Sequence, residues 1–439
     1  MAAQDSRDGS IMELREVNRM MYLRPDNGSL VDKRTHKEYN FSNLSYKTGS
    51  LAQSIIQSGA DGIWGPSSYL KVPVTLSSPI PAPAVERTFT IDNGTLGLNM
   101  IESVRLTHRS GEIIEFIDNF NLLGHVMLNW DNDLNEVAKL ESMLNAGSEI
   151  AGGVKTWTLA DDEESETFNV IIPLWLLLGC FANKDQYIPP NFLAGAKLEL
   201  KIANADVIFK TFAVGGVSGA MTISPSIVLD SAKVYDSVAA QILDQQADVE
   251  RSGLQFTYST WFNNNTTALS DQVNVDVQQS ASITEKVLAI FRNSDVVTDP
   301  AGEDSFLCLP IGKNYQWRLG STYYPQARVN LAGGQGEAYQ QTLIAWDSSP
   351  NQYHGYKSDG NCAVGLRDFS KLANFVAPHY ATTLEKSAVG LTLTGEPTNN
   401  ARSLNFSGSI SNPGSTDIQI YLKYTRIANV MGENLVVDR

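Results

Sequence analysis

The sequence has little of the chemistry that marks a redox, metal-binding or disulfide-bonded protein. Its three cysteines are Cys180, Cys308 and Cys362, which lie far apart, and it contains no Cys-x-x-Cys pair and no Cys/His cluster. A disulfide framework or a structural zinc site needs such groupings. We therefore expect three reduced and mostly buried thiols, as is usual in a protein made in the cytosol.

Catalytic and ligand-binding patterns are equally scarce. The histidines have no metal-ligand spacing, and no Ser or Cys stands in a nucleophile-elbow sequence. The glycines of AGGQGEAY (332–339) and GGVSGA (215–220) lack a full phosphate-loop or dinucleotide pattern, so we expect turns there. The acidic run DDEESE (161–166) lacks the spacing of a calcium loop and is typical of a solvated turn. The histidines are His36, His108, His125, His354 and His379.

These absences argue against an enzyme. We expect no catalytic, cofactor-binding or metal-binding residues and no cofactor, although a triad assembled from distant residues stays open. Charged residues make up only 18% of the chain, and the net charge is −15. Binding to nucleic acid needs clustered Lys and Arg. The acidic composition therefore disfavours direct nucleic-acid binding, and the low charge suggests that partners cover much of the surface.

Long apolar segments are also missing. The longest run, VIIPLWLLLGCFA (170–182), is too short to span a bilayer and is interrupted by Pro173. The first residues, MAAQDSRDGS, lack the apolar core of a signal peptide, so we expect synthesis in the cytosol.

Residues 5–23 show helical spacing of the apolar residues Ile11, Leu14, Val17 and Met21. Ser10 and Glu13 have the spacing of a capping box. Residues 1–47 carry eight basic and seven acidic side chains, a net charge of +1 beside an acidic body. We interpret residues 1–50 as an interaction arm; an ordinary helix packed on its own domain is the alternative.

The remaining sequence has the texture of an all-β protein, with short runs of β-branched and aromatic residues between Gly and Pro clusters. DLNEVAKLESMLNAG (133–147) is the exception and predicts an amphipathic helix ended by Gly147. In the first half we expect strands at KVPVTL (71–76), RTFTID (87–92), ESVRLTH (102–108), GEIIEFI (111–117), VKTWTL (154–159), FNVIIPLWLLL (168–178), KLELKI (197–202), ADVIFKTFAV (205–214) and IVLDSAKVYDSV (227–238).

After a polar segment at 239–252, which we interpret as a linker, the same texture begins again. A helix is predicted at 336–346, so each half has several strands, one helix and a long closing strand. The strands are predicted at GLQFTYSTWF (253–262), QVNVDVQQ (272–279), KVLAIFR (286–292), SFLCLP (305–310), YQWRLGSTYYPQARV (315–329), DFSKLANFVAP (368–378), AVGLTLTGE (388–396), SLNFSGSI (403–410) and DIQIYLKYTRIANV (417–430).

This repeat predicts two tandem jelly-roll β-sandwiches with short flanking helices, the first over 51–238 and the second over 253–439. A jelly roll buries the inner faces of two sheets and limits its exposed edges. Val273, Val275 and Val277 alternate with polar residues, as in a half-buried strand.

Four segments resemble the major capsid proteins of tailless double-stranded DNA viruses. IIPLWLLLGCFANKDQYIPPNFLAGAKLELKI (171–202) and IVLDSAKVYDSV (227–238) are similar to the late strands of the family's first roll. YQWRLGSTYYPQARV (315–329) is similar to its Arg-x-x-Gly…Tyr-Pro segment, and 403–431 to its closing turn and strand. The resemblance covers about 70–430, is nearest to polinton-like viruses and virophages, and extends more distantly to adenovirus and giant-virus capsid proteins.

The resemblance implies a homotrimer whose six rolls form a pseudo-hexagonal capsomer of an icosahedral shell. It implies neighbouring capsomers, penton and minor capsid proteins, and in some relatives an internal membrane, as partners. The location would then be the virion.

A carbohydrate-binding or glycan-processing protein with paired jelly rolls is the alternative. It would need a groove lined by aromatic residues or by two carboxylates. We expect the tryptophans to fill cores or interfaces instead. We also expect the Asn- and Thr-rich segments 262–272 and 395–405 to be exposed loops. The tryptophans are Trp64, Trp130, Trp157, Trp175, Trp261, Trp317 and Trp346.

Overall fold

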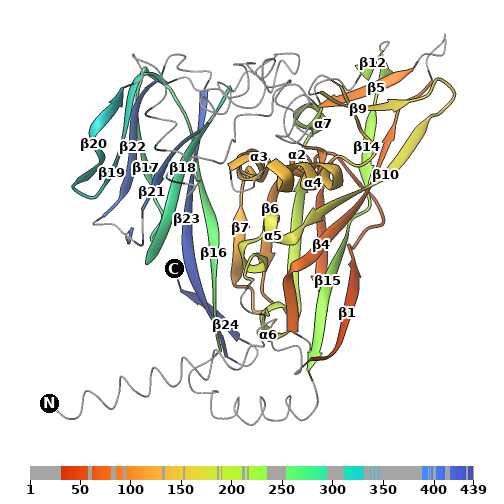
Figure 1. Ribbon diagram of the computed structural model, residues 1–439, viewed down its shortest axis with the longest axis horizontal. Coiled ribbons are helices and arrows are strands. Elements are labelled where there is room, and N and C mark those ends of the chain that lie inside the picture. The colour runs from red at the N-terminus through yellow and green to blue at the C-terminus, as the bar shows by residue number, and fades with distance from the viewer. Residues whose placement is uncertain are drawn as a thin grey trace.

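The computed structural model describes two β-sandwiches that lie side by side (Figure 1). Every statement below concerns the residues that the structure describes. These are residues 31–57, 62–80, 86–91, 95–130, 134–151, 154–184, 187–188, 190–209, 213–214, 217–234, 254–293, 311–330, 388–393, 395, 397–398, 402–410, 416–431 and 434–438, together with the isolated positions 337, 341 and 345.

The first sandwich consists of two main antiparallel sheets. In one sheet, β15 and β14 pair with successive stretches of β4, which leaves the opposite edge of β4 to β10. The resulting order is β1 (Val31–Asn40), β15 (Ser226–Val234), β4 (Gly62–Ser77) and β10 (Ser165–Pro173), with β14 (Ala220–Ile223) and β2 (Tyr46–Lys47) as additions. The other sheet has the order β3 (Leu51–Ile56), β11 (Ala196–Ile202), β6 (Ile101–Thr107) and β7 (Ile113–Ile117).

The second sandwich repeats this arrangement. One sheet has the order β16 (Leu254–Thr267), β23 (Thr416–Met431), β18 (Ile283–Asn293) and β21 (Ala388–Thr392), with β24 (Asn434–Asp438) on β23. The other has the order β17 (Gln272–Val277), β22 (Leu404–Ile410), β19 (Ile311–Leu319) and β20 (Thr322–Asn330).

The two halves have the same topology. When the eight main strands of each half are numbered along the chain, strands 1-8-3-6 form one sheet and strands 2-7-4-5 the other. This is the strand order of a jelly roll. Each of these sheets takes its strands from one side of 235–253, so we keep the proposed division of the rolls there, whereas the first roll begins at β1 and not at residue 51.

Smaller elements cap the first sandwich. Strands β5 (Arg87–Ile91), β9 (Val154–Leu159) and β8 (Glu149–Ala151) form a third sheet, and β12 (Ala213–Val214) pairs with β13 (Val217–Ser218). The helices are α2 (Leu96–Asn99), α3 (Phe120–Trp130), α4 (Leu134–Leu144), α5 (Leu174–Leu177), the 3-10 turn η2 (Gly179–Phe181), α6 (Pro190–Leu193) and α7 (Ala205–Ile208).

The helix predicted at 133–147 is confirmed as α4, and Gly147 follows it with φ +78°. Three other expectations for this half are wrong. The neighbouring helix α3 was not foreseen, so the first half has more than one helix. The strand predicted at 168–178 ends at Pro173 and continues as α5, because proline cannot donate to the next strand. The strand predicted at 205–214 begins as α7, whose first turn is closed by the N–H groups of Val207 and Ile208 donating to the backbone carbonyl of Asn204.

The predicted arm is too long, because β1 and β2 lie within residues 31–47 and pair into the first sandwich. The predicted loop at 262–272 is also corrected. Residues 262–267 continue β16, since pairing with β23 outweighs the low strand preference of asparagine. The segment at 395–405 begins with Gly395 at φ +81° and enters β22 at Leu404.

Several predictions lie outside the described residues. These are the helix at 5–23, the linker at 239–252, the strands at 305–310 and 368–378, the turn at 332–339, Cys308, Cys362, His354, His379, Trp346 and, apart from three positions, the helix at 336–346.

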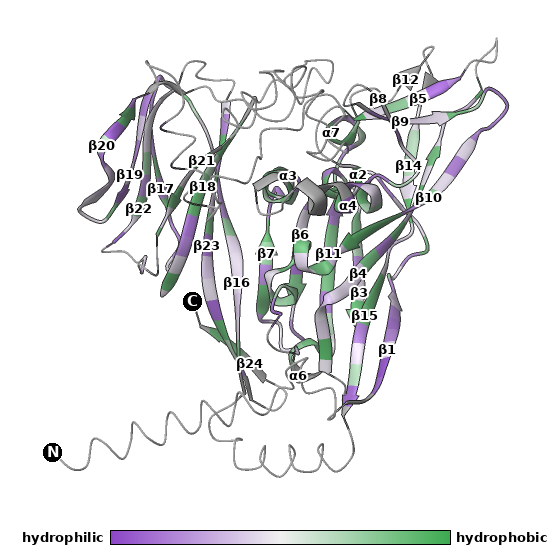
Figure 2. Ribbon diagram, in the orientation of Figure 1, coloured by the Kyte–Doolittle hydropathy of each residue, from purple (hydrophilic) through white to green (hydrophobic). Residues whose placement is uncertain are grey.

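The core explains how the sandwiches are joined. Along β18, Val287, Ala289 and Phe291 pack inside the second sandwich, whereas Leu288 and Ile290 belong to the buried cluster of the first. Successive side chains of a strand point to opposite faces, so this sheet is apolar on both. Figure 2 shows the contrast with β1, which is largely hydrophilic at the outer side of the first sandwich.

Candidate inter-roll interface

No cluster of three or more His, Cys, Asp or Glu side chains within the described residues could hold a metal ion. His108 is buried and its Nδ1 lies 2.8 Å from Ser110 Oγ, while His36 is exposed on β1. No helix among the described residues is long and apolar enough to cross a membrane.

The tryptophan prediction is confirmed for three of the described side chains, whereas Trp175 is partly buried against the core of the first sandwich and Trp64 is half-buried. Trp157 and Trp317 are fully buried, and Trp261 is nearly so. Trp157 donates from Nε1 to the carbonyl of Ala146 at 3.0 Å. Cys180 is also buried, as expected.

The candidate site is the interface between the two sandwiches, which we call the seam. Its apolar part is the outer face of the β16-β23-β18 sheet, which packs against α6, η2 and β7 of the first sandwich. Phe192 of α6 lies with its ring centroid 5.0 Å from that of Phe256 and 5.9 Å from that of Tyr258. Tyr421 and Ala428 are buried in the same cluster.

Polar side chains of the second sandwich donate hydrogen bonds to the edge strand β7 of the first. Among the described residues this strand pairs only with β6, so the carbonyls on its other side need other donors. Arg426 Nη1 donates to the carbonyls of Ile114 at 2.6 Å and Ile113 at 3.2 Å. Tyr258 Oη donates to Ile114 at 2.8 Å. The second sandwich therefore satisfies the edge of the first.

A second polar group lies where β7 ends. Tyr421 Oη donates to the carbonyl of Asn119 at 2.8 Å, and Asn119 Nδ2 donates to Gln419 Oε1 at 3.1 Å. Asn263 Nδ2 reaches the carbonyl of Asp118 at 3.1 Å and Gln419 Oε1 at 2.9 Å. Asn119 has φ +49°, a conformation that asparagine tolerates better than most residues.

Glu115 is completely buried beside this seam. Its carboxylate accepts hydrogen bonds from the backbone N–H groups of Gly179 at 2.8 Å and Cys180 at 2.7 Å. Burial raises the pKa of Glu115 to about 8, against the opposing effects of these two donors and of Arg426. Burial likewise raises the pKa of the Cys180 thiol.

Sequence reasoning missed Glu115, because GEIIEFI has the composition of an ordinary half-buried strand. The available signal was an acidic residue within an otherwise apolar strand.

Two glycines allow η2 to lie between the sandwiches. A Cβ on Gly179 would stand 1.7 Å from the carbonyl oxygen of Ser259 in β16. A Cβ on Gly65 of β4 would stand 2.3 Å from the carbonyl oxygen of Phe181. Both contacts are with backbone, so only glycine fits at these positions.

The close approach at Gly65 depends on an irregularity in β4. Val228 of β15 pairs with Tyr69, but Asp230 pairs with Trp64, so β4 carries extra residues between them. This is a β-bulge, which bends the strand that contains it.

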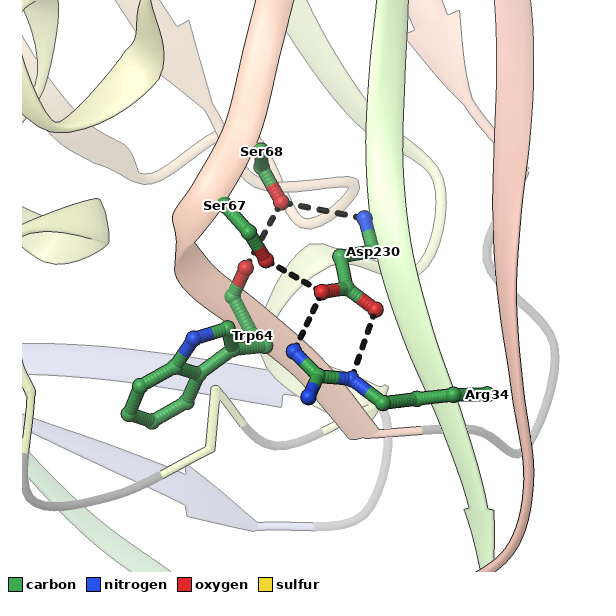
Figure 3. Close-up of polar contacts among 5 residues, drawn as sticks. All are labelled: Arg34, Trp64, Ser67, Ser68 and Asp230. Atoms are coloured by element: carbon green, nitrogen blue, oxygen red, sulfur yellow. Dashed lines mark hydrogen bonds and ion pairs between the residues drawn. The ribbon is translucent and has the colours of Figure 1, made fainter. Parts of the chain in front are cut away.

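Asp230 stabilises the bulge from the neighbouring strand (Figure 3). Its carboxylate accepts from Arg34 Nε at 3.1 Å and Nη2 at 2.5 Å, and from Ser67 Oγ. Ser68 Oγ accepts from the Asp230 backbone N–H at 3.1 Å and donates to the Trp64 carbonyl at 2.8 Å. The hydrogen bond to Asp230 raises the pKa of Arg34.

We expect Asp230→Ala to lower the free energy of unfolding by about 1–3 kcal/mol, because it removes the buried acceptor that Arg34 and Ser67 share. Arg34→Ala should cost less, roughly 1 kcal/mol or below, because the Arg34 side chain is 51% exposed. Urea unfolding of both variants gives the comparison. Equal losses would contradict the assignment of Asp230 as the centre of the network.

Glu115 should also make stability depend on pH. Its pKa is about 8 in the folded chain against 4.5 for the unperturbed group, so the unfolded chain releases this proton first. The contribution of Glu115 to the free energy of unfolding is therefore fully present below pH 4.5. It is lost as pH rises to 8, at about 1.4 kcal/mol per pH unit. Glu115→Gln should lack this fall, so the free energy of unfolding of the wild type minus that of the variant, measured in urea at each pH, should decrease as pH rises from 4.5 to 8. An unchanged slope would refute it.

Comparison with known proteins identifies the fold. The sequence matches no family model and no curated protein. Among solved structures, VP54 of PBCV-1 is 9% identical, with 93% of this chain and 97% of that one covered at a TM-score of 0.56. The Sputnik virophage structure is 11% identical, with coverages of 93% and 89% and a TM-score of 0.55.

The Faustovirus major capsid protein is 9% identical, with coverages of 91% and 90% and a TM-score of 0.56. These matches run through both sandwiches and confirm the two tandem jelly rolls predicted from the sequence. The chain has the double jelly-roll fold of viral major capsid proteins.

Proposed function

We propose that this chain is a major capsid protein that forms trimeric, pseudo-hexagonal capsomers of an icosahedral viral shell. The observation that carries the proposal is the fold shared with the Faustovirus major capsid protein over 91% of this chain. The seam supports it, because two like sandwiches held together by buried contacts give each chain two rigid, similar units. Three such chains can occupy a six-fold lattice position.

The proposed role is structural and not enzymatic. The chain acts by binding copies of itself and neighbouring capsomers, with penton and minor capsid proteins, and in some settings an internal membrane, as further partners. It is made in the host cytosol and resides in the virion. The chain has a net charge of −15, which favours a role as a shell subunit over direct binding to DNA.

The mass of the purified protein in solution tests this proposal. Three chains of 48.0 kDa give 144 kDa. Sedimentation equilibrium at micromolar concentration should yield the trimer mass. A chain that stays at 48.0 kDa up to the highest soluble concentration contradicts the proposal.

The arm is proposed to join capsomers to minor proteins or a membrane. Because β1 begins at Val31, the informative deletion removes residues 1–30 and keeps that strand. This deletion should leave the trimer mass unchanged and impair shell assembly. Deletion of residues 1–45 should instead reduce soluble protein, because β15 loses its partner β1. Loss of the trimer with the shorter deletion would place the arm in the fold.

No described feature favours the carbohydrate alternative. Trp157, Trp261 and Trp317, which could have lined a sugar groove, are buried. Saturable binding on a glycan array would revive it.

A further inference from the structure

The contact between the two sandwiches joins unlike surfaces. The second sandwich contributes the outer face of its 1-8-3-6 sheet, β16-β23-β18. The first contributes the edge strand β7 of its 2-7-4-5 sheet, together with η2 and α6. Since both sandwiches have the same topology, the chain carries one further copy of each surface. These are the outer face of β1-β15-β4-β10 and the edge strand β20.

We propose that the outer face of β1-β15-β4-β10 binds the β20 edge of a second copy of this chain. The contact repeats, between chains, the one that joins the two sandwiches within a chain. A head-to-tail contact of this kind leaves a free face and a free edge on every pair, so it continues until a ring closes. The inference rests on the proposed capsomer and names the surfaces that build it.

The register identifies which residues lie on this face. Along β4, Leu70, Val72 and Val74 are buried in the core, so the alternating Tyr69, Lys71 and Pro73 point outward. Asn169 of β10 pairs with Pro73, and Thr167 pairs with Thr75. Asn169 and Thr167 are exposed, as are four outward residues of β1: Arg34, His36, Glu38 and Asn40.

The two surfaces are suited to contact. Half-buried Trp64 and Tyr69 lie on the face, and Asp230 fixes the bulge beside them. On β20, Tyr323 is 47% exposed and Tyr324 is partly exposed. Tyrosine and tryptophan are enriched at protein interfaces. Figure 1 shows the sheets containing β20 and β1 at opposite sides of the molecule, where a head-to-tail ring requires them.

Arginine substitutions on each surface test the proposal. Asn169→Arg and Thr167→Arg each add a long charged side chain to the face, and Tyr323→Arg adds one to the edge. The matched control is Ile55→Arg, because Ile55 of β3 is 57% exposed on a different sheet of the first sandwich. Circular dichroism and thermal unfolding confirm that each variant is folded.

By sedimentation, the three surface variants should fall from 144 kDa to 48.0 kDa while Ile55→Arg stays a trimer. A mixture of Asn169→Arg with Tyr323→Arg should then give a pair of 96 kDa, two chains of 48.0 kDa, through one intact face and one intact edge.

The failures of the two proposals are distinguishable. Folded Asn169→Arg and Thr167→Arg chains that form trimers, or a mixture that stays monomeric, overturn the face-to-edge assignment and leave the capsomer proposal standing. A monomeric wild-type chain overturns the capsomer proposal, and this inference with it.

Discussion

Gly179→Ala should destabilise the chain by more than about 4 kcal/mol, in the range that marks severe backbone or packing conflicts. The added Cβ would lie 1.7 Å from the carbonyl oxygen of Ser259, a backbone atom held in the β16-β23 ladder. Either η2 or β16 must move. Movement of η2 would also break the hydrogen bonds that the backbone of Gly179 and Cys180 donates to Glu115.

The matched control is Gly62→Ala, whose added Cβ would meet Tyr187 Cβ at an ordinary 3.4 Å. Guanidinium unfolding followed by tryptophan fluorescence gives both free energies. Gly179→Ala should unfold in two separate steps, because the two sandwiches separate before each of them unfolds. A Gly179→Ala chain as stable as Gly62→Ala would contradict the close packing of η2 against β16.

Arg426→Met should cost about 3–5 kcal/mol, because it removes two hydrogen bonds from a charged donor, each of which contributes about 1.5–3 kcal/mol. Arg426 is only 6% exposed, and it supplies two hydrogen bonds to carbonyls of β7, which is an edge strand among the described residues. Methionine retains much of the apolar length but donates nothing. The substitution also removes a positive charge that lowers the pKa of Glu115, so that pKa should rise further.

Arg105→Met is the control for this substitution. Arg105 lies on β6 of the first sandwich, where its side chain is 44% exposed and its Nε lies 3.8 Å from Glu199 Oε2. Its loss should cost below about 1 kcal/mol. Equal losses for the two arginines, measured by urea unfolding at pH 7, would contradict the role of Arg426 in joining the sandwiches.

Much of the fold could be predicted because the strands of a β-sandwich have a recognisable local pattern of apolar and polar residues. Alternation in QVNVDV and the mixed apolar run KVLAIF marked β17 and β18 correctly. Errors arose where tertiary context decides, as at Asn263, which forms a strand because β23 pairs with it, and at α5, where Pro173 ends the ladder.

The site itself could not be found in the same way. The contacts of Arg426 with Ile114 and of Gly179 with Ser259 join positions that are distant in the sequence. No local pattern distinguishes such an arginine or glycine from a surface residue or a turn. The order of strands in two halves can be predicted from periodicity, but the packing of one half on the other requires the structure.

Electron microscopy of the purified full-length protein tests the central claim most directly. Class averages should show a three-fold particle with a pseudo-hexagonal outline, in which six sandwiches of two alternating kinds surround the axis. Averages that contain only single two-lobed chains, at concentrations where the protein remains soluble and folded, would contradict the capsid account.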